Sequence, residues 1–255
     1  MRLIRRNFDY ETLVELLKLA LPMVVSQGTF AVMIFTDRYF MSQIDPVHMA
    51  AALGGGVASF FSFCFFIGLL AYANALAAQY LGAGEPEKCP KVLTQGMVLT
   101  VMSLPFLTLI TFLVAGIFEG MGHEPEQVAL ERTYYLILMS GVLIALAKTC
   151  IASYFAGIGR TRVVMICDVF GLVINVPLSY VMVFGKLGFP ELGIVGAGVS
   201  TVASSVFAFA MYVAFYFHKE HRDKFQVLAS FTLDLKILRR FWRLGFPSGL
   251  ELFLN

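Results

Sequence analysis

The sequence predicts an all-α transmembrane protein built as a six-helix bundle, and two features of its 255 residues carry that prediction. Hydrophobic residues make up 58% of the chain and charged residues only 14%, whereas soluble domains hold roughly 45–50% and 25%. The apolar residues also gather in long runs that lack the strict alternation of barrel strands. This composition excludes an ordinary soluble enzyme, a disordered chain and a small disulfide scaffold.

Six apolar runs are long enough to cross a bilayer, which takes about 20 residues of helix. The first is expected to be a retained helix and no cleaved signal peptide, because polar residues follow the N-terminal arginines and the run is long. Glycines are frequent in the runs, and small residues let membrane helices approach closely. The four cysteines form no CxxC pair and are expected to be small buried hydrophobes. The predicted spans are residues 13–41, 50–80, 92–118, 133–158, 163–184 and 193–217.

The basic residues predict the orientation of these spans. Fifteen of the 19 lysines and arginines fall in the N-terminal segment, the second and fourth connections and the segment after the sixth span. Positive residues favour the cytoplasmic side, so a cytoplasmic N-terminus is expected. The acidic connection after the third span then faces outward, where His123 is expected to be an exposed loop residue and no metal ligand. The net charge of +2 is too balanced to suggest nucleic-acid binding.

A short repeat indicates how the chain is divided. The pattern of a basic residue, leucine, a small residue, an apolar residue and proline at residues 18–22 recurs at 243–247. We therefore expect a six-helix lobe over residues 1–217, a cytoplasmic linker over 218–238 and the start of a second lobe over 239–255. On this view the chain is the first part of a protein about twice as long, and its partner is the C-terminal lobe of that protein. The alternative is a complete six-span protein with a C-terminal interfacial helix.

Charged residues inside the spans need a structural or functional reason, since each costs at least roughly 2.5–3.5 kcal/mol at a helix centre. Asp37 in the first span must find a partner, bind a cation or carry a proton, unless it forms an interfacial pair with Arg38. Lys148 in the fourth span either pairs with a carboxylate or extends toward the cytoplasmic end. Asp168 is most simply a charge at the interfacial end of the fifth span.

Neutral polar residues of the fifth span add oxygen ligands. Asn175 and Ser179 are four residues apart and share one helix face, while Pro177 between them removes a backbone donor and can expose a carbonyl. A carboxylate, an amide oxygen, a hydroxyl and a carbonyl suit Na⁺ or a proton relay better than a soft metal. No metal ligand set and no catalytic residues are expected.

Several segments together resemble the N-terminal lobe of the multidrug and toxic compound extrusion (MATE) transporters, especially the bacterial NorM-like branch. The resemblance covers nearly the whole chain, and its most specific part is the block that begins NVPLSY at residue 175. The matching segments are LALPMVVSQ, the TD pair of the first span, ANALAAQYLGAGE, GIGRTR, the NVPLSY block and RLGFPSGL.

The resemblance implies a twelve-helix fold of two lobes in the bacterial inner membrane, with lipids around it. It implies export of varied, often cationic, organic compounds in exchange for Na⁺ or H⁺, with no cofactor besides that coupling ion. The family's cation or proton site falls on Asp37, Asn175 and Thr201, and Ser179 stands where some members carry a second aspartate. Pro22 is the expected hinge of the first span.

The remaining expectations concern the substrate cavity and the second lobe. Gln27, Asn74 and Lys148 are expected to line the cavity. The family's glutamate on the seventh span falls on Asn255, with Glu251 one turn earlier, so that site differs here.

Three other functions are less compatible with the sequence. A lipid-linked oligosaccharide flippase of the same superfamily is disfavoured because few basic residues can line the cavity. An intramembrane enzyme is disfavoured because HExxH and GxSxG are missing and all four histidines fall in predicted loops. A purely structural membrane protein is disfavoured by the acidic residue in the first span.

Overall fold

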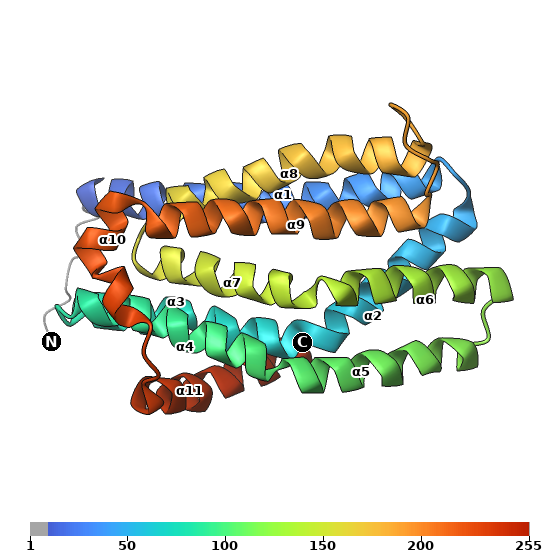
Figure 1. The fold of residues 1–255 in the computed structure, drawn as a ribbon. Helices are drawn as coiled ribbons and strands as arrows, with labels where there is room; N and C mark the ends of the chain where they lie inside the picture. Colours follow the sequence, from blue (N-terminus) through green and yellow to red (C-terminus); the bar gives the residue numbers. More distant parts are fainter. Residues whose placement is uncertain (1–9, 255) are drawn as a thin grey trace, which may run out of the picture.

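The computed structural model describes residues 10–254, nearly all of them helical, and the long helices run side by side along one direction (Figure 1). The N-terminal arginines and Asn255, on which two of the predictions above depend, lie outside the described residues. Three short 3₁₀ turns lie at Pro86–Lys88, Phe118–Gly120 and Val227–Ser230. The helices are α1 (Tyr10–Ser42), α2 (Pro46–Ala71), α3 (Ala73–Gly82), α4 (Cys89–Met102), α5 (Leu104–Ile117), α6 (Pro125–Ser140), α7 (Val142–Gly157), α8 (Thr161–Phe184), α9 (Ile194–Phe217), α10 (Lys219–Phe225) and α11 (Leu235–Leu254).

The all-helical fold with several membrane-spanning helices is confirmed. Within the described residues, four helical segments are long and apolar enough to cross a membrane, and the number rises to six if each of two bent pairs is one span. The pair α4–α5 bends by 40° and the pair α6–α7 by 50°. Pro105 lies in the first turn of α5 and cannot donate a helical hydrogen bond. The second bend is at Gly141, where a Cβ would come within 2.7 Å of Val202 on α9.

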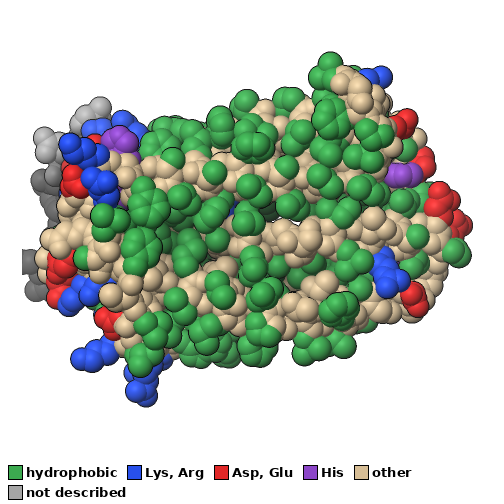
Figure 2. Space-filling view, in the orientation of Figure 1, with side chains coloured by type: hydrophobic (Ala, Val, Ile, Leu, Met, Phe, Trp, Pro, Cys, Tyr) green, Lys and Arg blue, Asp and Glu red, His purple; other side chains and the backbone are tan. Residues whose placement is uncertain are grey.

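The surface has the distribution expected of a protein in a bilayer. Apolar side chains cover the middle of the face in view, and charged side chains gather at its two ends (Figure 2). Many large apolar residues are exposed, among them Phe35, Phe106 and Phe112 at 62–72% exposure. Soluble proteins rarely expose so much apolar surface, and this distribution is typical of a membrane protein.

Three of the long helices form one packed group. Helices α1, α8 and α9 lie together along one side of the bundle, with α1 and α9 both against α8 (Figure 1). Helix α2 crosses the bundle and contacts α1, α6, α7 and α11. The C-terminal helix α11 begins at Leu235, four residues before the predicted start of the second lobe, and packs along α2.

Two histidines that were expected in loops lie on helices. His48 is in the first turn of α2, and its backbone N–H donates a hydrogen bond of 2.8 Å to the side chain of Asp45, which caps the helix. His221 is on α10 and is fully buried, with its Nε2 3.1 Å from the Tyr154 hydroxyl. Burial, helped by the nearby charges of Arg160 and Lys224, lowers the pKa of His221 to about 4. The neutral imidazole thus anchors α10 against α7.

All four cysteines are buried and form no disulfide, as predicted.

Candidate functional site

A buried carboxylate on α1 is the centre of the candidate site. Asp37 is only 6% exposed. Ser179 of α8 donates its hydroxyl to Oδ1 at 3.1 Å, and Thr201 of α9 donates its hydroxyl to Oδ2 at 3.0 Å. Each carboxylate oxygen therefore has a donor from a different helix. An isolated buried charge is costly, and these two hydrogen bonds link α1 to α8 and to α9.

Asn175 lies one helical turn from Ser179 on α8 and is also fully buried. Its Nδ2 donates to the Ser204 hydroxyl of α9 at 3.4 Å, but its Oδ1 has no hydrogen-bond partner among the described residues. Buried polar atoms are rarely left unpaired. Asn175 thus makes no hydrogen bond to Asp37, and its unused oxygen belongs to the residue one helical turn before Ser179.

Arg38, the neighbour of Asp37 in the chain, does not neutralise it. Among residues 10–254 no ion pair joins Arg38 to any carboxylate, and both oxygens of Asp37 are bonded to hydroxyls instead. The geometry therefore disfavours the alternative of an interfacial Asp37–Arg38 pair. Consecutive helix residues point about 100° apart, which explains why the two side chains separate.

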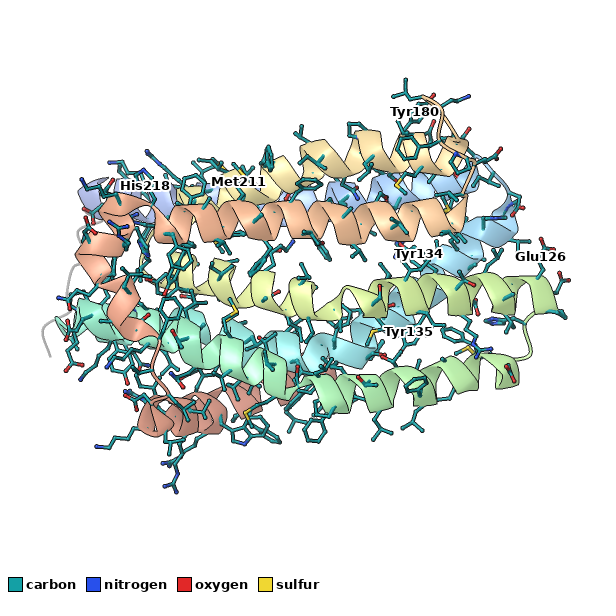
Figure 3. All side chains as sticks on the ribbon, in the orientation of Figure 1. Glu126, Tyr134, Tyr135, Tyr180, Met211 and His218 are labelled. Atoms are coloured by element: carbon teal, nitrogen blue, oxygen red, sulfur yellow. The ribbon has the colours of Figure 1, made fainter. Side chains whose placement is uncertain are left out.

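An apolar cluster covers one side of this carboxylate. Met41 and Val183 each follow a site residue, Asp37 or Ser179, by four positions, and Ala197 precedes Thr201 by four. These residues pack with Tyr134 of α6, which Figure 3 labels. Met41 and Ala197 are fully buried. The cluster separates Asp37 from the end of the bundle where α1 ends and α9 begins.

The predicted cavity residues are not brought together with this site. Gln27 and Asn74 are exposed, and Lys148 is half-buried. Among the described residues none of the three makes a side-chain hydrogen bond, and Lys148 has no carboxylate partner within ion-pair distance. Pro22 is buried within α1. An open apolar groove of about 510 Å³ lies elsewhere, between α4, α7 and α9, and includes Met97, Ile151 and Phe209.

The prediction that Asp168 is a charge at an interfacial helix end is wrong. Its carboxylate accepts hydrogen bonds from Ser26 of α1 and, at 3.1 Å, from Tyr212 of α9. Tyr212 is fully buried. Asp168 lies two turns inside α8, and its proximity in sequence to Arg160 and Arg162 concealed this inward contact.

Sequence reasoning also missed Glu131 of α6, a carboxyl group whose side chain is 99% buried. It lies near the end of the bundle where α1 ends and α9 begins, away from Asp168. Gln127 donates to Oε1 at 2.8 Å, and the ring Nδ1 of His123 is 3.1 Å from Oε2. His123 was expected to be only an exposed loop residue. The i, i+4 spacing of Gln127 and Glu131 was the available signal. Within the described part of the chain, no three or more His, Cys, Asp or Glu side chains form a metal-binding group.

Comparison with known proteins gives a consistent match. The MatE family model matches residues 22–181. The chain is 29% identical over 252 residues to a probable multidrug resistance protein NorM of Bradyrhizobium diazoefficiens, covering 98% of this chain and 54% of the relative. It is 30% identical to the multidrug resistance protein NorM of Vibrio cholerae, covering 94% and 53%. The chain therefore spans about half the length of the curated relatives it matches.

Solved structures show the same fold. An outward-facing multidrug resistance MATE family transporter of the MOP superfamily matches with a TM-score of 0.83 at 22% identity, covering 93% of this chain and 52% of that one. A MOP superfamily transporter from Pyrococcus furiosus matches with the same score, identity and coverage. A MATE structure in a bent conformation matches with a TM-score of 0.80 at 22% identity, covering 92% and 52%.

Proposed function

Because this chain belongs to the MatE family of multidrug transporters, which are integral membrane proteins and not enzymes, we propose that it forms the N-terminal lobe of a secondary exporter. The exporter expels small organic compounds, often cations, in exchange for Na⁺ or H⁺. The curated relatives carry the name multidrug resistance protein, and that name supports the substrate class. The second lobe of the same protein is the partner, and the bacterial inner membrane is the location.

The observation that carries the proposal is the buried carboxylate of Asp37, held by one hydroxyl from α8 and one from α9. The free energy of a buried carboxylate changes strongly when it binds a proton or a cation. The polar groups bonded to Asp37 are two hydroxyls, and Asn175, one turn from Ser179, adds an unpaired amide oxygen. Hard oxygen ligands suit Na⁺, and the hydroxyls equally suit a proton. Ser179 and Thr201 contribute hydroxyls and no carboxylate, so Asp37 is the acidic group of this site.

Coupling follows from the position of Asp37 on α1. Its hydrogen bonds hold α1 against α8 and α9, so an ion at Asp37 changes the strength of that attachment. Pro22 interrupts the hydrogen bonding of α1 fifteen residues earlier, which favours bending there. An ion moves this equilibrium only if it binds the two arrangements of α1 with different affinity. Export results when the arrangement stabilised by the ion holds the substrate weakly.

The proposed orientation places the N-terminus and α10 in the cytoplasm. The connection between α7 and α8 and the segment after α9 carry eight of the 16 lysines and arginines in residues 10–254. Figure 2 shows these basic groups concentrated at the end of the bundle where α10 lies. Positive residues favour the cytoplasmic side of a membrane.

The test uses the complete gene product in liposomes that contain a fluorescent organic cation. A Na⁺ gradient and a pH gradient are imposed separately, and substrate movement is measured for wild type, Asp37→Asn and Ser205→Ala. Ser205 is the matched control because its hydroxyl bonds only a carbonyl of its own helix, that of Thr201. We expect movement driven by one gradient, its loss in Asp37→Asn and its retention in Ser205→Ala. Wild-type efflux by Asp37→Asn would contradict the assignment, and inactivity of folded wild type would favour a lipid flippase.

A further inference from the structure

The seam where α1, α8 and α9 meet contains the same arrangement twice. At one level Asp37 of α1 accepts hydrogen bonds from Ser179 of α8 and Thr201 of α9. At the other level Asp168 of α8 accepts hydrogen bonds from Ser26 of α1 and Tyr212 of α9. Each level thus consists of one aspartate with two hydroxyl donors, and each of the three helices contributes one residue to it.

The two levels are related by one constant spacing. On each helix the second residue lies eleven positions from the first, as the pairs 26 and 37, 168 and 179, and 201 and 212 show. Eleven residues make three helical turns, so both members of a pair lie on the same helix face about 16 Å apart. Helices α1 and α8 run in one direction and α9 runs in the other. The residues of the second level, Ser26, Asp168 and Tyr212, therefore all lie at the same end of the seam, and we call this level the inner site. The seam is therefore polar at two depths, separated by three turns.

A polar group also lies between the levels. Asn175 is seven residues beyond Asp168 and four before Ser179 on α8. It is fully buried, its amide donates across the seam to Ser204, and its Oδ1 has no partner among the described residues. One unpaired amide oxygen therefore lies between the levels of the two carboxylates.

Few other charges face Asp168. From α1 it meets the Ser26 hydroxyl and from α9 the Tyr212 hydroxyl. The nearest candidate base in the sequence, Lys148 of α7, forms no ion pair with Asp168 within 4 Å in the described structure. Asp168 is thus not neutralised by a contacting base.

We propose that Asp168, with Ser26 and Tyr212, is a second site for the coupling cation, through which the ion leaves the Asp37 site toward the cytoplasm. This inference rests on the proposed exchange function and extends it. The cation, either Na⁺ or H⁺, occupies the outer carboxylate first and the inner carboxylate on release. Because Ser26 is four residues after Pro22, occupancy of the inner site also changes how α1 is held next to its hinge.

Everted membrane vesicles containing the complete protein expose the cytoplasmic face to the bath and so test the inner site. The ion concentration of the lumen is held constant, and bath Na⁺ and bath pH are varied separately while drug uptake is measured. Bath ions should inhibit uptake by occupying the inner site. We expect Asp168→Asn to lower the maximal rate about tenfold and to shift the half-inhibiting ion concentration by at least tenfold. Asp168→Glu should restore both, and Ser205→Ala should match wild type.

A merely structural role for Asp168 predicts a different result. A lower rate with an unchanged half-inhibiting concentration, or an unchanged rate and concentration, would overturn the proposal. If Asp168→Asn fails to insert, Tyr212→Phe keeps the carboxylate and removes one donor, and an unchanged half-inhibiting concentration in that variant overturns the proposal equally. Different outcomes test the proposed function. It is contradicted only if the wild-type protein shows no ion-driven uptake, or if Asp37→Asn retains ion-driven uptake.

Discussion

The α1–α8–α9 seam and the contact of α2 with α11 join helices in two different ways. In the seam, carboxylates accept hydroxyl hydrogen bonds at two depths. Along α2 and α11, glycines allow the backbones to touch, and a Cβ at Gly249 would come within 2.5 Å of the Phe65 carbonyl oxygen. A Cβ at Gly68 would lie 2.6 Å from the Ser248 carbonyl oxygen. Neither of these glycine contacts contains an ionisable side chain.

This difference indicates which part of the molecule responds to ions. Close backbone packing in a membrane depends on shape and changes little with pH or salt. A buried carboxylate bonded to neighbouring helices changes its interactions whenever it gains or loses a charge. We therefore expect α2 and α11 to move as one unit, and α1 to change its contacts with α8 and α9 during transport.

Removing one hydroxyl from the seam should have the largest effect on ion use. Thr201→Val deletes the donor to Oδ2 of Asp37 but keeps the shape of the side chain. A hydrogen bond to a charged group contributes about 1.5–3 kcal/mol, so the ion concentration that half-maximally drives efflux should change about 10- to 100-fold. Transport titrations in proteoliposomes measure this change. Thr201→Ser, which keeps the hydroxyl, should have a half-driving ion concentration close to that of wild type. An unchanged concentration in Thr201→Val would show that Thr201 does not contribute to ion binding.

The pH dependence of stability should contain a contribution from outside the seam. Folding lowers the pKa of His221 from 6.5 to about 4, so between these values the unfolded chain binds more protons than the folded one. Stability should therefore fall as the pH drops from about 6.5 to 4, by at most about 3 kcal/mol.

Thermal melting in detergent across this pH range measures the effect. His221→Gln should flatten the dependence, while substitution of the exposed His218 by Gln should leave it as in wild type. Equal pH dependence in His221→Gln and wild type would assign the acid sensitivity to other groups.

Crowding the glycine contact should reduce stability without altering ion use. Gly249→Leu places a side chain against the Phe65 backbone, and overpacking of this kind costs about 1–3 kcal/mol. Thermal melting should show the loss. The matched control is Gly116→Ala on α5, where nothing lies within 4 Å of the added Cβ and a slight stabilisation is expected. A changed half-driving ion concentration in Gly249→Leu would contradict the view that only the α1–α8–α9 seam responds to ions.

Much of the fold could be predicted from the sequence because hydropathy in a membrane protein is a local property. A run of about 20 apolar residues forms a helix wherever it crosses the bilayer. The predicted bounds therefore lie within four residues of the observed helices, except that the fourth span begins eight residues earlier, at Pro125. The bends within two spans were missed, although Pro105 and Gly141 marked them. Asp37 was recognisable as a candidate because a carboxylate inside a membrane span is energetically costly and so has a structural or functional role.

The amino-acid sequence by itself determined the helical class, the spans and the presence of a carboxylate in the first of them. Only the tertiary structure decided which groups meet that carboxylate: Ser179 and Thr201 contact it, and Asn175 does not. It also turned Asp168 inward, toward Ser26 and Tyr212. The partners of Asp168 are 142 and 44 positions away in the chain, and their register depends on how α1, α8 and α9 pack. No local pattern encodes that register, because it results from the combined fit of side chains along three separate helices.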